Sequence, residues 1–375
     1  MWPYALCFIT LIGAIIKTIA LNHIMIQETS KFDINNRKYL GSKNRLLDFL
    51  EKTITQNTSK KIGVFVDIFS GTGVVANRFR KFSKKVIAND ILFANFVINK
   101  VFLNSTKNNV KIPKIEKVIK QLNDLKQQKG YCYKNFGDAY FTKENAGYID
   151  AIREEIEVLK NNKKITNQEY YVLLTSLLFA VDKIANTVGQ YDAYLKHIGK
   201  SSYDKNGKHL SDSNIYKKIE LKMPIIIFDG NNEVFNTDAN KLIKEIKCDV
   251  LYLDPPYNHR QYVDSYHILE NIIRWEKPLV FGKTKKFQRD HLKSKYSKKG
   301  HATYALEDLI NNAKCKHIFL SYNNEGIIPD EEIERILKNK GELEVYKMQY
   351  KIFGNGAGQS KKRPITERVF YCKVK

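Results

Sequence analysis

The pattern of apolar and polar positions along the chain predicts an α/β fold. Continuous apolar runs bounded by polar residues are typical of buried strands in parallel sheets. The first part predicts, in order, a helix within residues 37–58, a strand, a glycine-rich loop, a helix to about Phe82 and a second strand, which is how a doubly wound sheet begins. The last two predicted strands are candidates for an antiparallel pair. All predicted strands together are 61–69, 85–88, 249–253, 316–322, 344–350 and 367–374.

Residues 105–225 differ from the segments on either side. They are rich in Lys, Asn, Gln and Tyr, and the stretch from Gly199 to Ser213 is polar and predicts a loop. We therefore expect a catalytic unit formed by residues 37–104 and 226–375, interrupted by a mainly helical insertion. Helices are predicted in the insertion near residues 114–128, 145–160 and 167–185.

Residues 1–36 are expected to be an extension outside the catalytic unit. The apolar run from Trp2 to Ile16 is shorter than the roughly 20 residues that span a bilayer. It also lacks the basic start and small-residue cleavage site of a signal peptide. The preferred interpretation is an upstream start assignment, with Met25 as the working initiator. A membrane anchor and a helix packed on the domain are the alternatives.

The charge of the chain suggests a partner. The 375 residues include 63 Lys and Arg against 40 Asp and Glu, a formal net charge of +23. Such an excess favours a polyanion, because cationic side chains neutralise phosphates and release counterions. A lysine-rich solvated surface is the alternative. The basic stretches 283–299 and Lys361–Arg363 are candidates for contact with a DNA backbone.

The five cysteines are scattered and form no CxxC pair, so the sequence predicts neither a zinc site nor a disulfide framework. Their use fits a reducing, cytoplasmic compartment. The apolar fraction of 43% is enough for a full core, which excludes wholesale disorder.

A glycine-rich turn follows the first predicted strand. Residues 67–73 have the sequence Asp-Ile-Phe-Ser-Gly-Thr-Gly, and glycine allows a backbone to approach a ligand closely. The turn matches neither the P-loop pattern, which is excluded, nor the dinucleotide pattern GxGxxG. A ligand here would lie beyond the carboxyl ends of the strands. A methyltransferase loop and a purely structural turn both remain open at this point.

Asp90 ends the second strand, 17 residues after Gly73. A carboxylate in this place can accept hydrogen bonds from both ribose hydroxyls of a nucleoside. The structural alternative is a helix N-cap, where Asp is favoured.

The sharpest signal is the segment Asp254-Pro255-Pro256-Tyr257 after an apolar run. The prolines fix the backbone and remove two N–H donors, which leaves the Asp254 carboxylate and the Pro255 carbonyl as acceptors. An exocyclic amine needs such acceptors for its two hydrogens while its lone pair faces an electrophile. Tyr257 offers a face on which an extruded base can stack. A rigid Pro-Pro turn is the alternative.

These motifs together resemble the D12-class, Dam-like adenine-N6 DNA methyltransferases. The resemblance covers about residues 37–375 and includes Lys38-Tyr39-Leu40-Gly41-Ser42-Lys43 besides the segments above. Their order resembles the α group, in which a target-recognition region, here the insertion 105–225, lies between the glycine loop and the Asp-Pro-Pro-Tyr segment. The segments Val188–Asp192 and Asn258–Tyr262 look more like those of methylases from restriction–modification systems.

The resemblance implies a Rossmann-like fold that binds S-adenosylmethionine. Tyr39 and Lys43 would contact the methionine end of this cofactor, and Asp90 would bind its ribose. Asp238 would hold its adenine, with Asp229 as a weaker rival. The residues that would shape the pocket are Asp67, Phe69, Gly71 and Gly73.

On the target side, the resemblance implies that Asp254 and Tyr257 grip an adenine, with Pro255 and Pro256 fixing the turn. Ser70 and Thr72 lie between the key positions of the glycine loop, which is within the variation of the family but not diagnostic.

The implied activity is site-specific methylation of adenine N6 in DNA, as the modification enzyme of a restriction–modification system. The base would be flipped out of the duplex and attack the sulfonium methyl directly, without a covalent intermediate or a metal. The expected partners are double-stranded DNA and a separately encoded restriction endonuclease, with no stable membrane partner. The alternatives are an RNA or protein-glutamine methyltransferase of the same fold and a non-catalytic DNA-binding relative.

Overall fold

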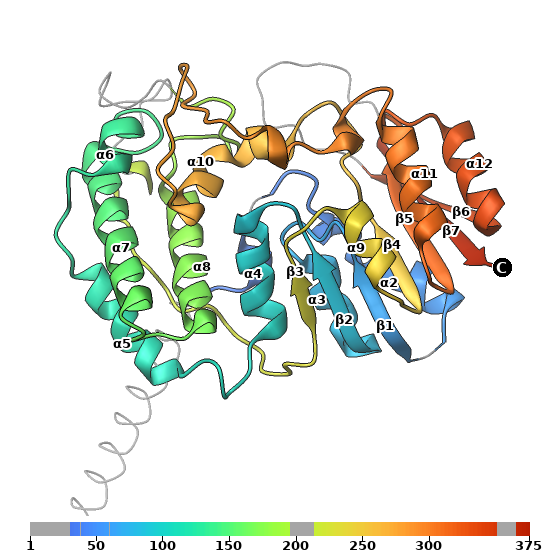
Figure 1. The fold of residues 1–375 in the computed structure, drawn as a ribbon, viewed down its shortest axis with the longest axis horizontal. Helices are drawn as coiled ribbons and strands as arrows, with labels where there is room; N and C mark the ends of the chain where they lie inside the picture. The colour runs from blue at the N-terminus through green and yellow to red at the C-terminus, as the bar shows by residue number, and fades with distance from the viewer. Residues whose placement is uncertain (1–30, 38, 60, 196–213, 351–364) are drawn as a thin grey trace, which may run out of the picture.

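The computed structural model describes residues 31–37, 39–59, 61–195, 214–350 and 365–375. Its centre is a seven-stranded sheet with the strand order β3-β2-β1-β4-β5-β7-β6 (Figure 1). The first five strands in this order run parallel, and β7 is antiparallel to both of its neighbours. This confirms the predicted doubly wound α/β sheet and the antiparallel last pair. The strands are β1 (Ile62–Asp67), β2 (Ser83–Asn89), β3 (Glu233–Phe235), β4 (Val250–Leu253), β5 (His317–Asn323), β6 (Gly341–Tyr350) and β7 (Ile365–Val374).

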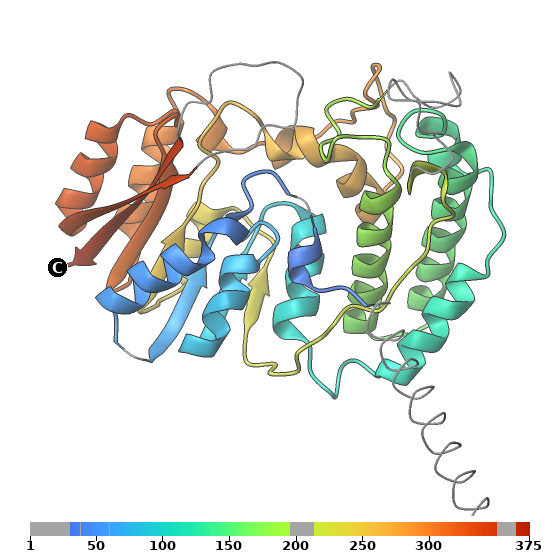
Figure 2. The ribbon, with the colours of Figure 1, turned by 180° about the vertical axis from the view of Figure 1, so that it is seen from behind.

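Helices cover both faces of the sheet, as Figures 1 and 2 show from opposite sides. One layer contains α2 (Leu47–Asn57), α3 (Val74–Phe79) and α4 (Phe93–Asn104), and the other contains α9 (Ala239–Glu245), α11 (Ala302–Asn312) and α12 (Asp330–Lys340). Alternate side chains of a strand point to opposite faces. On β1, Phe65 accordingly joins the core of the first layer, whereas Val64 and Val66 pack into that of the second.

The insertion is helical, as predicted, and it packs beside α4 (Figure 1). The three expected helices are confirmed and a short fourth one is added. Their apolar side chains belong to the same buried core as the α2–α4 layer, so the insertion is continuous with the catalytic half. The predicted loop 199–213 lies outside the described residues. The helices are α5 (Ile112–Asn123), α6 (Tyr131–Asn135), α7 (Lys143–Asn161) and α8 (Asn167–Ile184).

Helix α10 (Tyr262–Arg274) joins the insertion to the sheet. The buried Arg153 of α7 donates to the carbonyl oxygens of Ile272 and Ile273, at 2.8 and 3.2 Å, in the last turn of α10. A cation is favourable at this end of a helix. Glu270 of α10 accepts from the first backbone N–H groups of α4, those of Phe93 and Ala94.

The sequence pattern missed β3 and the helices α4, α9, α10, α11 and α12. With three residues, β3 is too short to show a period.

Phe32 and Ile34 are buried in the core of the α2–α4 layer, and the Phe32 ring stacks on Phe179 at 4.3 Å. Met25, the apolar run 2–16 and the basic cluster 361–363 lie outside the described residues. No helix within the described ranges is long and apolar enough to cross a bilayer.

Candidate active site

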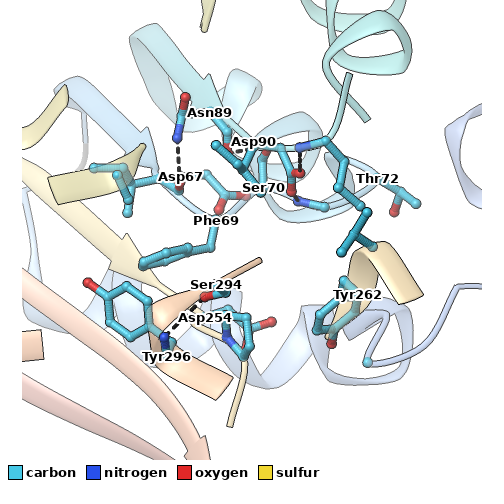
Figure 3. Close-up of a pocket in the computed structure, with 18 of the residues that line it drawn as sticks. Asp67, Phe69, Ser70, Thr72, Asn89, Asp90, Asp254, Tyr262, Ser294 and Tyr296 are labelled. Atoms are coloured by element: carbon cyan, nitrogen blue, oxygen red, sulfur yellow. Dashed lines mark hydrogen bonds between the residues drawn. The ribbon is translucent and has the colours of Figure 1, made fainter. Parts of the chain in front are cut away.

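A pocket lies where β1, β2 and β4 end (Figure 3). Besides these strand ends, its walls come from residues 39–43, the start of α10 and residues 291–296. Pro255, Tyr257 and Gly73 adjoin the pocket in the chain but are not among the described residues that line it. The predicted site residues that do line it are Tyr39, Lys43, Asp67, Phe69, Gly71, Asp90, Asp238, Asp254 and Pro256.

The glycine loop is held by Asn99 of α4. Its amide nitrogen donates to Ser70 Oγ and to Gly71 O, both at 3.0 Å. Gly73 has a φ of +83°, and a Cβ built there would lie 1.9 Å from Asn99 Oδ1. Gly73 therefore acts through the backbone, because its conformation and the close approach of Asn99 both favour glycine. Sequence reasoning missed Asn99, although two asparagines four residues apart, Asn95 and Asn99, interrupt a mostly apolar helix.

Asp90 follows β2 and binds the backbone of the glycine loop. One carboxylate oxygen accepts from Gly71 N at 2.9 Å and the other from Leu92 N at 2.8 Å. Burial raises the pKa of Asp90 to about 7, although these hydrogen bonds act in the opposite direction. A carboxylate oxygen has room for a second hydrogen bond, so both oxygens can still accept from a ligand.

Asp67 ends β1 with a buried carboxyl group. Its Oδ2 accepts from Ala76 N at 3.2 Å, whereas its Oδ1 has no hydrogen-bond partner among the described residues. Burial, and then the negative charge of Asp254, holds the pKa of Asp67 well above its usual range. A buried acceptor without a partner is costly, so this oxygen is a suitable attachment point for a cationic donor.

Tyr39 forms the wall opposite Gly71. Its ring stacks on Tyr266 at 4.5 Å and on Tyr262 at 5.6 Å, and its hydroxyl accepts from the Asn95 amide at 2.9 Å. These contacts fix the Tyr39 ring close to the glycine loop. A Cβ built at Gly71 would lie 3.4 Å from the ring. Lys38 lies outside the described residues.

Lys43 lies under the Asp-Pro-Pro-Tyr turn. Its ammonium is 3.0 Å from Asp254 Oδ1 and 3.0 Å from Oε1 of Glu367 on β7. Burial alone would lower the pKa of Lys43, but the two carboxylates outweigh it and raise that pKa well above its usual range. Burial raises the pKa of Asp254 to about 6, with Lys43 acting in the opposite direction. The Lys43 ammonium also lies 5.7 Å from the centre of the Tyr257 ring.

The structure separates the two candidates for the adenine of the cofactor. Asp238 lines the pocket and caps α9 by accepting from Lys241 N at 3.1 Å. Asp229 accepts from Arg80 Nε at 2.7 Å and is not among the described lining residues. Asp238 is therefore the better placed of the two. Nearby, Phe69 meets Tyr296 edge to face at 4.9 Å (Figure 3).

Two segments that are distant in the sequence, 188–192 and 258–265, lie in contact beside the pocket. The Arg260 guanidinium donates to the amide oxygen of Gln190 at 3.4 Å. Ser265 Oγ donates to Asp192 at 3.0 Å. The basic stretch 283–299 reaches the same rim. Its Ser294 exchanges two hydrogen bonds with Gln261 and lines the pocket (Figure 3).

The sheet order, the reversed β7 and the glycine loop facing an Asp-Pro-Pro-Tyr turn define the class of Rossmann-like methyltransferases. The chain belongs to the D12 class of N6 adenine-specific DNA methyltransferases, whose family model matches residues 39–336. Membership in this class implies a methyl donor.

Several curated proteins are similar to this chain. Modification methylase StsI of Streptococcus sanguinis is 40% identical over 90% of this chain and 52% of its own length. Type II methyltransferase M.NlaIII of Neisseria lactamica is 36% identical over 84% of this chain and 92% of its own. Type II methyltransferase M.FokI of Planomicrobium okeanokoites is 35% identical over 89% and 52%. The chain thus spans about half the length of two of these relatives.

Among solved structures, an rRNA methylase from Streptococcus thermophilus covers 90% of this chain and 100% of its own, at 10% identity and a TM-score of 0.25. At that score the likeness carries no argument.

Proposed function

We propose that the protein transfers a methyl group from S-adenosylmethionine to N6 of an adenine in double-stranded DNA. The observation that carries this proposal is that the Asp254–Pro256 turn shares one pocket with the glycine loop and Asp90. Such a pocket can hold a nucleoside-containing cofactor and a target amine next to each other, so that proximity supplies much of the rate.

The pocket fits the charge of this cofactor, which supplies an electrophilic methyl group on a sulfonium when bound. Oδ1 of Asp67, which has no hydrogen-bond partner within the described part of the chain, would accept from its ammonium. Asp90 would accept from its ribose hydroxyls, and Asp238 would lie at its adenine. Tyr39 and Lys43 remain the proposed neighbours of the methionine end, although in the structure the Lys43 ammonium is already shared by two carboxylates.

The target adenine would be held by the acceptors of the Asp-Pro-Pro-Tyr turn. The Asp254 carboxylate would accept one N6 hydrogen and stabilise the positive charge that develops on the nitrogen. The Pro255 carbonyl would accept the other hydrogen, and the Tyr257 ring would stack on the base. The backbone oxygen of Tyr257 accepts from Ile327 N at 2.8 Å, which fastens the end of this turn.

The Asp90 carboxyl predicts that cofactor binding depends on pH. Ribose hydroxyls favour the ionised carboxylate, so binding releases a proton and affinity rises as the pH rises through about 7. Because the pKa of Asp90 is higher in the folded protein than in the unfolded chain, ionisation lowers the stability of the cofactor-free protein from about pH 4 to 7. Calorimetry with S-adenosylhomocysteine in two buffers of different ionisation enthalpy measures the release. Asp90→Asn should reduce it, and an unchanged release in that variant would contradict the assignment.

We propose that the duplex lies over the insertion and the basic stretch 283–299. Residues 281–286 form a small hairpin beside α10, visible as the orange loop above α8 in Figure 1. Its Thr284 carbonyl lies 3.0 Å from the hydroxyl of the buried Tyr140 and 2.6 Å from His267 Nε2. The exposed Phe281 has lysines close to it in the hairpin sequence. This combination suits a polyanion whose bases offer aromatic faces for stacking.

Arg260 is expected to contact the DNA, because it is exposed just after the Asp-Pro-Pro-Tyr segment and its guanidinium is held by Gln190. Arg260→Ala should raise the Kd for duplex DNA roughly tenfold and leave the Kd for S-adenosylhomocysteine unchanged. Fluorescence anisotropy with a labelled duplex measures the first value. The matched control is Arg335→Ala, which removes a partly exposed arginine of α12. Equal effects of the two variants would place the DNA elsewhere.

The test of the proposed function is incubation of the protein with methyl-labelled S-adenosylmethionine and unmethylated DNA, followed by nucleoside analysis. Label in N6-methyladenine is the expected result. Cofactor binding without label in DNA would reject it and favour an RNA or protein-glutamine substrate. Absence of cofactor binding would favour a non-catalytic DNA-binding relative.

A role as the modification enzyme of a restriction–modification system follows from the same proposal. It is supported by the printed names of the relatives, which are modification methylases and type II methyltransferases. A separately encoded restriction endonuclease would then be a partner in the system.

A further inference from the structure

The cluster under the Asp-Pro-Pro-Tyr turn contains a carboxylate that no catalytic motif includes. Glu367 Oε1 accepts from Ser321 Oγ at 2.8 Å and lies 3.0 Å from the Lys43 ammonium. The exposed fractions of the Lys43, Asp254 and Glu367 side chains are 6%, 18% and 2%. Lys43 is thus held at equal distance from a catalytic and a remote carboxylate.

The formal charge of this cluster is unusual for a purely structural ion pair. One ammonium and two carboxylates leave a net charge of −1, and an excess buried charge costs stability. A pair of Lys43 and Asp254 alone would be neutral. A net negative site is, however, suited to a reaction in which positive charge moves from a sulfonium to a nitrogen.

We propose that Glu367 is a positioning residue for methyl transfer. By binding the Lys43 ammonium, Glu367 weakens the interaction of that ammonium with Asp254, so that Asp254 remains a strong hydrogen-bond acceptor for the target amine. This inference rests on the proposed function. Glu367 reaches the site through the register of β7, in which it lies opposite Asn323 of β5. Without Glu367, the whole ammonium charge would be directed at Asp254.

Several other titratable groups surround Asp254, and they stay in place when Glu367 is replaced. Asp67 faces it from β1, Tyr252 from β4, and Tyr262 from α10, with Tyr257 on the same turn. Glu367 raises the pKa of Asp254 and Lys43 lowers it. Neutralising Glu367 removes a repulsion and strengthens the Lys43 attraction, so both changes lower the pKa of Asp254.

The test compares Glu367→Gln with Glu342→Gln, a matched change at an exposed position of β6. Glu367→Gln should lower kcat about tenfold or more and leave the Kd for S-adenosylhomocysteine within about threefold. The Asp254 pKa of about 6 predicts an acid limb of the pH–rate profile near that pH in the parent. In Glu367→Gln this limb should move to a pH lower by about 0.5–1. Carbon-13 NMR of labelled Asp carboxyl groups in the cofactor-free protein should show the same shift, with the Asp254 signal identified by Asp254→Asn.

Glu367→Asp keeps the charge and serves as the conservative variant. It should keep the Asp254 titration near that of the parent and lose less kcat than Glu367→Gln. An Asp254 titration that does not move in Glu367→Gln, or a parental kcat in that variant, would overturn the inference while the proposed function stands. A parent protein that transfers no methyl group would reject the proposed function and this inference together.

Discussion

Asp254→Ala is expected to lower the rate of methyl transfer to DNA by about a thousandfold or more. The carboxylate is the one charged acceptor that the Asp-Pro-Pro-Tyr turn offers to the target amine. Its loss removes both the orientation of N6 and the stabilisation of positive charge on it. The measurement is single-turnover transfer of labelled methyl groups to an unmethylated duplex.

The variant is expected to fold and to bind cofactor, because Lys43 keeps its contact with Glu367 and no buried ammonium is left alone. Calorimetry with S-adenosylhomocysteine should therefore give a Kd within about threefold of the parent. Asp254→Asn retains one carbonyl oxygen and should be impaired less than Asp254→Ala. Parental transfer rates in the alanine variant would remove Asp254 from the mechanism.

Gly73→Ala is expected to destabilise the protein by about 2–5 kcal/mol and to abolish cofactor binding. At a φ of +83°, an alanine pays about 1–2 kcal/mol for the left-handed conformation. Its Cβ would also lie 1.9 Å from Asn99 Oδ1, and overpacking typically costs 1–3 kcal/mol more. Asn99 cannot move without losing its hydrogen bonds to Ser70 and Gly71. Urea unfolding and calorimetry measure the two effects.

Gly300→Ala is the matched control for this prediction. Gly300 has the same φ of +83°, but a Cβ there would meet nothing within 4 Å. The control should therefore cost only the conformational part, about 1–2 kcal/mol, and keep cofactor binding. Equal losses of stability in the two variants would mean that the contact with Asn99 is not what requires glycine at position 73.

The glycine loop and the Asp-Pro-Pro-Tyr turn could be recognised in the sequence, because their chemistry depends on a few adjacent residues. Glycine permits φ values that other residues avoid, and proline removes N–H donors, wherever the segment lies in the fold. Apolar runs before these motifs likewise placed them at strand ends, so Asp67, Asp90 and Asp254 could be expected along one edge of the sheet.

The sequence alone could not show which side chains from distant segments meet. The resemblance assigned Lys43 to the cofactor, whereas the structure places its ammonium between Asp254 and Glu367. The resemblance ranked Asp238 above Asp229 as the expected contact to adenine. The structure adds that Asp238 lines the pocket, whereas Asp229 pairs with Arg80 and is not among the described lining residues.

The sequence by itself thus determined the fold class and, through its motifs, the resemblance to the family, and it predicted a local chemistry for each motif. Only the tertiary structure decided that Glu367, 113 residues after Asp254 in the chain, shares its buried lysine. The physical reason is that a strand pattern sets which face a side chain occupies, while strand order and register set its neighbours. Here β7 enters antiparallel beside β5, and that register carries Glu367 to the active-site edge.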